Sequence, residues 1–470
     1  MTRVLEFVVA LIIVFILAVI VGLFLPSHAH IQRSIEISHN PQHIYDVLNN
    51  FRRFDDSAGA GLKALDPGVK FSLSGPAYGP GATVSWQGDP AIGGGKLVNK
   101  SGSIDITNRS TVTWDLTNDW HGKNKVFTLE VGPKQGQRVS TVTWSYDVDY
   151  GWNLIGRYSS LWIHGDPSTI IQYGLGSLQN MLAGIANVDY SKVQPGLYKT
   201  NATPVLLVST KAPRTVDDID TAKTAAMKEI QAAMAKLGVK AAGPTTTIRT
   251  EWGDTTFIFD LAVPINSTSL TVNGKAYDLT QLPTALTGTN VAPTSAKPAS
   301  SASAGAPASA TSAGAAATAD NGPAPGSLDS HNRLVVDANV RAMMMPAGEV
   351  LAASWTGESG VQFMVKALEA YAGTHGYKFD ENAAPAYNEL ASLPSVSDDS
   401  QVFRVFLPVQ DAPAQTPDQI AGHTQAFTAL DPSLWSGAGA QPAASGKQEA
   451  AKKKPEARKK PAPARKRHRG

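Results

Sequence analysis

The chain has 470 residues, contains no cysteine and carries a formal net charge of +2. The absence of cysteine excludes disulfides, iron–sulfur clusters and thiolate chemistry. Residues 447–470 hold 11 Lys/Arg and 2 Asp/Glu, which leaves 30 basic and 37 acidic residues elsewhere, so an acidic body precedes a basic tail.

Residues 1–30 are expected to be a transmembrane anchor. The run Phe7–Leu25 is 19 residues long, has no charged residue and is followed by Pro26. A helix of that length spans ~28 Å, close to the hydrocarbon thickness of a bilayer. The alternative is a cleaved signal peptide with its site near Ser27-His28-Ala29, although signal peptides usually have a shorter apolar run. The flanking Lys/Arg are nearly balanced, and the short N-terminal head favours a single-pass protein of the bacterial inner membrane with its bulk in the periplasm.

Residues 31–195 are predicted to form an antiparallel sheet covered by helices. Apolar residues alternate with polar ones along four segments, which marks strands with one buried face. The inward positions are Ala82, Val84 and Trp86; Val112, Trp114 and Leu116; Phe127, Leu129 and Val131; and Val142, Trp144, Tyr146 and Val148. A first helix is expected to start at Asn40-Pro41 and a long closing helix at Asp166-Pro167, each with a capping residue before proline. A sheet curved around the closing helix would leave a cavity between them.

This order of elements, with Tyr78–Ala82, Val84–Trp86 and Thr141–Trp144, resembles the polyketide cyclase/dehydrase group of the START-like helix-grip (SRPBCC) superfamily. The resemblance implies a hydrophobic ligand cavity. Its candidate ligand-binding residues are Trp86, Trp114, Trp144 and Tyr146. Two alternatives stay open: these rings only fill the core, or the cavity hosts a cyclase/dehydrase-type reaction. The reaction needs an inward proton-transfer group, and the strand pattern places no Asp, Glu or His on the inward face.

Residues 203–410 contain the same order of elements twice, which indicates an internal duplication. The first copy comprises a strand at Val205–Val208, a helix at Asp217–Leu237 ending before Gly238, and strands at Thr246–Thr250 and Thr255–Val263. The second comprises a strand at Leu334–Met345, a helix at Val361–His375 ending before Gly376, and a strand at Val402–Val409. The fold class is therefore α+β throughout.

The segments Met345–Val350 and Trp355–Gly357 make this duplicated unit resemble the gyrase-inhibitor-like effector-binding domain of bacterial transcription activators. The resemblance implies a groove between the halves that binds a small cationic or aromatic molecule. The candidate residues are Trp252, Trp355, Tyr387, Asn388 and Glu389. A glutamate among aromatic rings attracts cations by charge and by cation–π contact. The alternative is an exposed glutamate on a turn, with the rings serving only in packing.

Two segments are expected to be disordered. In residues 292–326, 32 of 35 positions are Ala, Pro, Ser, Thr or Gly, so residues 286–330 form a flexible insertion between the two copies. Residues 411–470 form a disordered tail whose basic end would bind a polyanion: anionic lipid, an envelope polymer or nucleic acid. A merely solubilising extension is the alternative.

The sequence shows no catalytic or metal-binding constellation, and no cofactor is expected. His39 and His43 lie four residues apart without a carboxylate partner, which favours a structural role. We therefore expect a membrane-anchored, small-molecule-binding protein with a sensing or regulatory role. The alternatives are an enzyme of the cyclase/dehydrase type and an envelope scaffold that acts through its basic tail.

Overall fold

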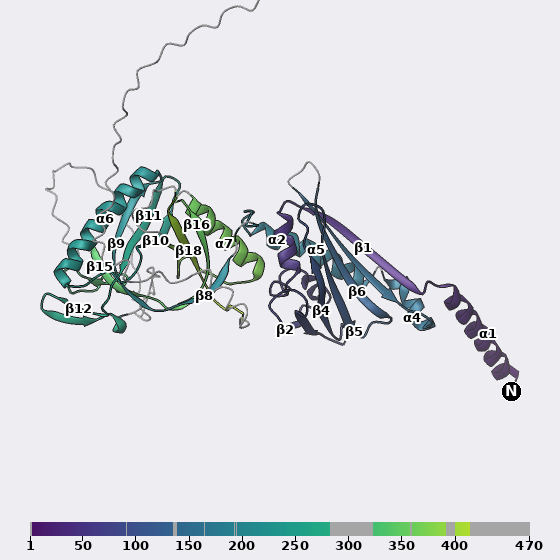
Figure 1. Cartoon of the computed structure of the whole chain (residues 1–470). Coiled ribbons are helices and arrows are strands. Elements are labelled where there is room, and N and C mark those ends of the chain that lie inside the picture. The colour runs from purple at the N-terminus through teal and green to yellow at the C-terminus, as the bar shows by residue number, and fades with distance from the viewer. Residues whose placement is uncertain are drawn as a thin grey trace, which may run out of the picture.

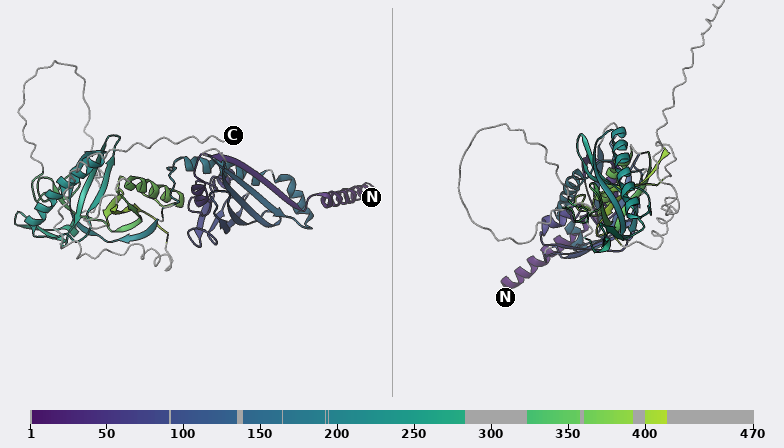
Figure 2. Two further views of the ribbon diagram at one scale, coloured as in Figure 1. Left: turned by 45° about the horizontal axis from the view of Figure 1, so that its top comes forward. Right: turned by 90° about the vertical axis from the view of Figure 1, so that its left-hand side faces the viewer.

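The computed structural model describes residues 2–90, 92–134, 139–163, 165–191, 193, 195–282, 323–357, 360–391 and 400–413. The described residues form an α+β structure with two large antiparallel sheets, each with helices packed on it (Figure 1). We call residues 28–185 the first sheet unit and residues 196–413 the second sheet unit. An N-terminal helix projects from the end of the first sheet unit that lies away from the second (Figures 1 and 2).

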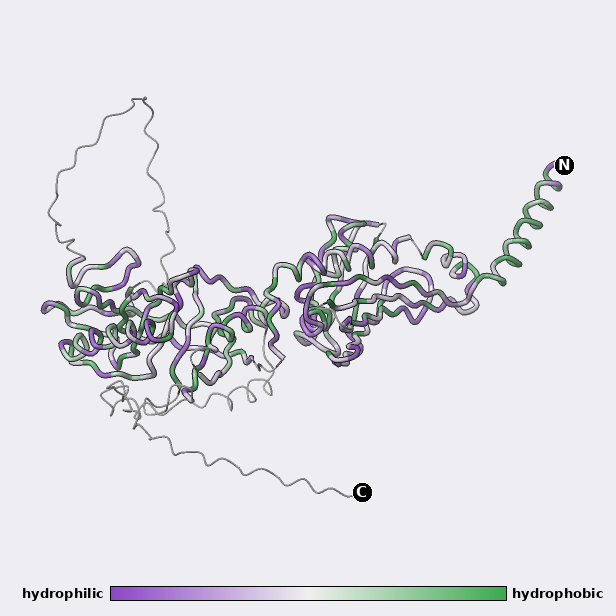
Figure 3. The backbone as a smooth tube through the Cα atoms, turned by 90° about the horizontal axis from the view of Figure 1, so that it is seen from above, coloured by the Kyte–Doolittle hydropathy of each residue, from purple (hydrophilic) through white to green (hydrophobic). Residues whose placement is uncertain are grey.

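The N-terminal helix α1, Thr2–Phe24, contains the predicted apolar run except for its last residue, Leu25. An 18-residue window within Arg3–Phe24 has a mean hydropathy of 3.4, and the helix is long and apolar enough to cross a membrane. Figure 3 shows α1 as a hydrophobic helix whose N-terminal part projects away from the two units. The helix ends at Phe24, two residues before Pro26, which cannot continue it.

The first sheet unit contains one curved sheet of seven strands within the described residues. In sheet order they are β1 (His28–Ile37), β7 (Ser140–Asp149), β6 (Lys123–Pro133), β5 (Ser110–Asn118), β4 (Gly94–Ser103), β3 (Thr83–Gln87) and β2 (Lys70–Ser74). Its helices are α2 (Pro41–Leu48), α3 (Ala60–Leu65), α4 (Leu154–Ser159) and α5 (Asp166–Ala183), with the 3-10 turn η1 (Ser160–Trp162) after α4. A strand, short helices, a six-stranded meander and a long closing helix make up the predicted helix-grip arrangement.

The predicted inward faces of these strands are confirmed, because all thirteen inward positions from Ala82 to Val148 are buried. They pack against α2, α3 and α5 in one hydrophobic core. The Asn40 cap is also confirmed, since its side chain accepts a hydrogen bond from the Gln42 amide at 2.9 Å. The Asp166 cap is wrong: Gly165 occupies that position, and Asp166 lies inside the first turn of α5. A carboxylate there is still favoured by the helix dipole.

Close backbone contact holds α3 against α5. A Cβ atom on Gly61 of α3 would lie 2.2 Å from the Ile170 carbonyl oxygen of α5. Only glycine therefore fits at this crossing. The helices α3 and α5 thus form a compact layer over the sheet.

The second sheet unit has a nine-stranded sheet within the described residues. In sheet order the strands are β14 (Leu334–Val335), β15 (Val340–Met345), β9 (Thr203–Pro213), β11 (Thr256–Pro264), β10 (Thr246–Trp252), β17 (Tyr387–Leu390), β18 (Val402–Val409), β16 (Gly348–Thr356) and β8 (Gly196–Thr200). Its other elements are α6 (Val216–Leu237), α7 (Val361–His375), η2 (Leu279–Gln281) and the hairpin β12 (Ser269–Val272) with β13 (Lys275–Asp278). Gly238 and Gly376 end α6 and α7 in the left-handed conformation, as predicted.

The centre of this sheet has the order β9-β11-β10 followed by β17-β18-β16, so the two groups of three mirror each other. In that order β16 occupies the place that corresponds to β9. The predicted first strand of the second copy, Leu334–Met345, is therefore misplaced, because β15 pairs with β9 instead. The sheet also starts earlier than predicted, since β8 pairs with β16.

The two sheet units touch where α2 approaches the C-terminal end of α7. The Asn50 side-chain amide donates a hydrogen bond to the Thr374 carbonyl at 3.1 Å. The Arg52 guanidinium donates to the Gly376 carbonyl at 3.0 Å. Backbone carbonyls at the end of a helix carry partial negative charge, so a guanidinium is a favourable partner there.

The segments predicted to be disordered lie largely outside the described residues. Residues 323–330, at the end of the predicted insertion, are described, and Gly326 donates a backbone hydrogen bond to Val335 at 2.8 Å. The insertion prediction therefore extends too far at this end. The basic tail from residue 447 onward lies outside the described residues, and its polyanion partner stays a prediction.

Candidate ligand cavity

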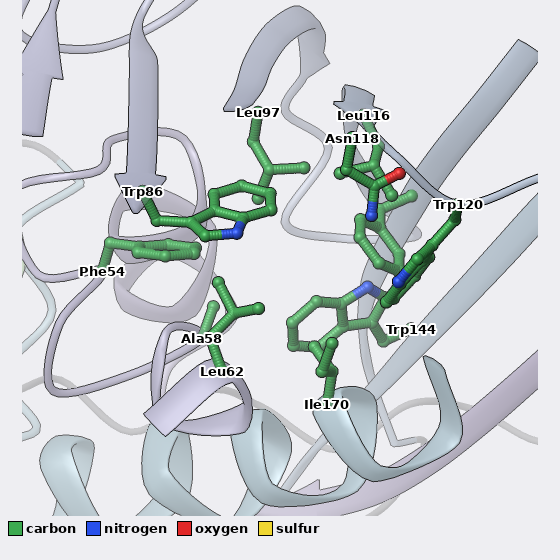
Figure 4. A pocket seen from close by; sticks show the side chains of 11 residues that line it. Phe54, Ala58, Leu62, Trp86, Leu97, Leu116, Asn118, Trp120, Trp144 and Ile170 are labelled. Carbon is green, nitrogen blue, oxygen red and sulfur yellow. The ribbon is translucent and has the colours of Figure 1, made fainter. Parts of the chain in front are cut away.

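The interior of the first sheet unit contains a small inner cavity of about 20 Å³. It lies between the sheet and the layer of α3 and α5 (Figure 4). Its lining consists of Phe54, Ala58, Leu62, Trp86, Leu97, Leu116, Asn118, Trp120, Phe127, Trp144 and Ile170. A volume of this size holds about one water molecule. The inner cavity alone therefore does not accommodate an organic ligand.

The three tryptophans predicted as ligand contacts are all core residues. Trp86, Trp114 and Trp144 are 6%, 1% and 2% exposed. Trp86 and Trp144 also line the inner cavity, on opposite sides of it in Figure 4. Trp114 contributes no part of the lining and packs edge-on against Trp144, with ring centres 5.7 Å apart.

The indole N–H groups of these tryptophans are buried without a hydrogen-bond partner among the described residues. An unpaired buried donor costs free energy, so most such groups in proteins find an acceptor. Trp86 and Trp144 belong to the lining of the inner cavity, whose wall is apolar, so their donors lie just behind that wall. An acceptor atom of a bound molecule or a water would satisfy them.

A larger outer cavity of about 510 Å³ lies at the end of the first sheet unit that is nearer to α1. Its lining consists of Asp119, Trp120, His121, Tyr146, Tyr150, Ser159, Ile163, Gly165, Asp166 and Pro167. Trp120 lines both cavities and packs edge-on against Tyr146 at 5.9 Å. The side chain of Trp120 therefore stands between the inner space and the outer one.

The turn that carries Trp120 is fixed by Lys125. The Lys125 ammonium donates hydrogen bonds to the Trp120 carbonyl at 2.8 Å, and to the carbonyl and side-chain oxygens of Asn118 at 2.6 and 2.8 Å. Burial lowers the pKa of Lys125 and raises that of the Tyr146 phenol. Three charge-assisted bonds hold the backbone of this turn while the Trp120 ring remains only half-buried.

Sequence reasoning missed most of the outer cavity. It predicted Tyr146, which lines this cavity, but it placed no acid or histidine on the inward face. Asp119, His121 and Asp166 nevertheless line the outer cavity, from positions outside those strand faces. Asp119 and His121 belong to the turn between β5 and β6, and Asp166 to the start of α5, where strand alternation gives no signal.

In the second sheet unit, Tyr387 and Glu389 share one face of β17. Tyr387 stacks on Phe406, with ring centres 4.8 Å apart. Glu389 lies directly opposite Arg404 of β18. Burial raises the pKa of Glu389 to about 7, and the charge of Arg404 opposes this rise. Asn388 lies between them in sequence and so on the other face of the strand.

The structure does not place Trp355 beside Glu389. Trp355 pairs with Phe403, one position from Arg404, and packs against Phe363 of α7 at 5.7 Å, on the opposite face of the sheet. On β10, Thr246 is the residue that pairs with Glu389. Trp252 is six positions further along this strand, a backbone distance of ~20 Å. Trp355 therefore does not share a site with Glu389, whereas Tyr387 lies on the same face. A contribution of Trp252 stays a prediction.

His39 and His43 contact each other, with 3.1 Å between their Nδ1 atoms. The other ring nitrogens reach backbone carbonyls of Ile185 and Val188. Among the described residues, no three His, Asp or Glu side chains come together in a way that could hold a metal ion. The pair is a packing contact of α2.

No protein family model and no curated protein matches the sequence. Solved structures resemble parts of the chain. Norcoclaurine synthase from Thalictrum flavum, solved in complex with dopamine and hydroxybenzaldehyde, is 14% identical over 34% of this chain and 89% of its own, with a TM-score of 0.26. Ara h 8.0201 is 12% identical over 33% of this chain and 99% of its own, with a TM-score of 0.24. The EcmrR C-terminal domain is 10% identical over 47% of this chain and 99% of its own, with a TM-score of 0.28. At these sequence identities and TM-scores, the activities of those proteins do not carry over to this chain.

Proposed function

We propose that the chain is a membrane-anchored small-molecule-binding protein whose ligand occupies the outer cavity and reaches the inner one past Trp120. The outer cavity of about 510 Å³ carries this proposal, because its size falls within the range of ligand pockets. The α1 helix would hold this receptor at a membrane, and a sensing or regulatory role would follow from that position.

The lining defines the class of ligand. Trp120, Tyr146 and Ile163 offer an apolar wall, while Asp119, His121 and Asp166 form a polar border. The unpaired indole donors of Trp86 and Trp144 lie beyond Trp120. An apolar or aromatic molecule with one hydrogen-bond acceptor at its inner end matches this order of groups.

Binding is tested by native mass spectrometry and thermal shift on the full chain in detergent. The panel consists of aromatic and aliphatic ketones, with the matching hydrocarbons as acceptor-free controls. We expect saturable binding that the Ser159→Trp variant abolishes by filling the outer cavity. The matched control is Thr268→Trp, an exposed site of the second sheet unit. The proposal fails if no compound binds or if both variants bind alike.

We propose a second candidate site on the sheet face that carries Tyr387 and Glu389, where the effector-binding resemblance implies a groove. The stacked pair of Tyr387 and Phe406 beside Glu389 supports it, because an aromatic cation at the carboxylate would lie next to these buried rings. With a pKa of about 7, Glu389 is charged at pH 8 and mostly protonated at pH 6.

Calorimetry with tetraphenylphosphonium at pH 6 and pH 8 tests this site. We expect tighter binding at pH 8, and a loss of at least about tenfold in Glu389→Gln at that pH. Trp355→Phe is the control, because Trp355 packs on the opposite face. Binding that is independent of pH and equal in Glu389→Gln would exclude the groove.

A further inference from the structure

The segment from Tyr150 to Ile163, which links β7 to α5, exposes apolar side chains. Trp152 is 84% exposed, Ile155 is 70% exposed and Leu161 is 57% exposed. Arg157 is the one charged residue of the segment in the sequence. It is 8% exposed, so its charge does not face water. We call Trp152, Ile155 and Leu161 the apolar edge.

The segment is bound to the last turns of α1. The Tyr158 hydroxyl donates a hydrogen bond to the Ala18 carbonyl at 2.6 Å. The Arg157 guanidinium donates to the carbonyls of Leu23 and Leu25 at 3.0 and 3.3 Å. Gly22 lies so close that a Cβ atom there would be 3.2 Å from the Tyr158 ring. These contacts fix α4 alongside the C-terminal end of α1 (Figure 1).

The position of these contacts along α1 determines the depth of α4 relative to a membrane that α1 spans. Ala18 lies six residues before Phe24, which is ~9 Å along a helix. The whole of α1, at 23 residues, is ~35 Å long and slightly exceeds a hydrocarbon core of ~30 Å. A bilayer spanned by α1 would therefore reach the level of α4. Tryptophan and aliphatic side chains are favoured at this level, and Arg157 would keep its charge on helix-end carbonyls.

We propose that the apolar edge lies in the bilayer interface, so that the outer cavity opens beside lipid. Tyr150, Ser159 and Ile163 of the same segment line that cavity. The backbone of Tyr150 also donates to the Ser27 carbonyl at 2.7 Å, three residues after α1 ends. The inference rests on the membrane anchoring proposed above and defines the ligand further. An amphiphile dissolved in the membrane enters the cavity directly from the lipid.

Site-directed spin labelling tests the depth of the apolar edge. The chain has no cysteine, so each introduced cysteine is the only labelling site. The full chain is placed in phosphatidylcholine/phosphatidylglycerol nanodiscs with labels at Ile155→Cys and Leu161→Cys. Ile104→Cys is the control, since Ile104 is 51% exposed at the opposite end of the sheet. Val14→Cys, in the middle of α1, reports the membrane span itself.

Collision rates with oxygen, which enters lipid, and with a neutral nickel chelate, which stays in water, give the depth of each label. We expect the ratio of the oxygen collision rate to the nickel collision rate to be several-fold higher at Ile155 and Leu161 than at Ile104. Such a ratio corresponds to a position ~5–10 Å inside the interface. Ratios equal to that at Ile104, with Val14 inside lipid, overturn the inference while the anchor stands. Labels shielded from both agents indicate a protein partner and also overturn it. A water-exposed Val14 label overturns the anchor as well.

Discussion

The Tyr190 hydroxyl donates a hydrogen bond to Asp46 Oδ2 at 2.7 Å. The same hydroxyl lies 2.8 Å from Thr374 Oγ1, so Tyr190 connects α2 of the first sheet unit with α7 of the second. Burial raises the pKa of Asp46 to about 7, with only the Tyr190 bond opposing the rise. The contact between the units thus contains a carboxyl group that titrates near neutral pH.

Asp46→Asn should remove a pH dependence of stability. The folded pKa of Asp46 lies above its unfolded value, so its contribution is fully present below about pH 4 and is lost as pH rises through about 7. The variant should therefore gain stability over the parent chain between pH 5 and pH 8, by at most ~4 kcal/mol. Urea unfolding in detergent at both pH values measures this gain. A difference that does not change with pH would contradict the assigned titration, and the exposed Asp115→Asn serves as control.

His375 should act in the opposite direction. It is half-buried at the end of α7, where its Nδ1 lies 2.9 Å from the Tyr371 carbonyl, and desolvation lowers its pKa to about 4. A folded pKa below the unfolded value gives stability that is present above about pH 6.5 and is lost as pH falls through about 4. His375→Asn should therefore reduce the loss of stability between pH 7 and pH 4.5.

Unfolding midpoints at these two pH values measure the effect of His375→Asn. The exposed His28→Asn is the control. His43 also has a pKa lowered by burial to about 4, so part of the acid loss should remain in His375→Asn. An acid loss equal to that of the parent chain would contradict the role of His375.

Two glycines of α5 should respond oppositely to alanine. A Cβ atom on Gly174 would lie 2.6 Å from the Trp144 ring and 3.0 Å from the Ala58 carbonyl, whereas one on Gly176 meets nothing within 4 Å. Gly176→Ala should stabilise the chain by ~0.5–1 kcal/mol through helix propensity. Gly174→Ala should destabilise it by ~1–3 kcal/mol through overpacking. Thermal unfolding of both variants measures this, and a shift of the same sign in both would refute the close approach.

The sequence was informative wherever a local pattern decides the structure. Alternation placed Trp86, Trp144 and Tyr146 on the inward face, because the two-residue period of a strand does not depend on the rest of the fold. The helix ends at Gly238 and Gly376 were likewise predictable from left-handed glycine caps.

Pairing between segments that are distant in the sequence could not be predicted from local patterns. Trp355 and Glu389 were expected to share a groove, but the register of β16, β18 and β17 places them on opposite faces. Asp119 and His121 reach the outer cavity from a turn, and the bond between Asp46 and Tyr190 joins residues 144 positions apart. Such contacts depend on tertiary packing, and no spacing in the sequence encodes them.

Trp120→Ala should create a site that free indole fills. The ring separates the inner and outer cavities and is half-buried, so its removal should join the two spaces and cost ~1–3 kcal/mol of stability. Indole replaces the missing side chain and should raise the unfolding temperature of the variant in proportion to its occupancy. Trp152→Ala is the control, because an 84% exposed ring leaves no cavity behind. If indole stabilises Trp120→Ala and not Trp152→Ala, the result supports a passage past Trp120. If indole affects both variants equally, or neither, the Trp120 ring does not separate the two cavities.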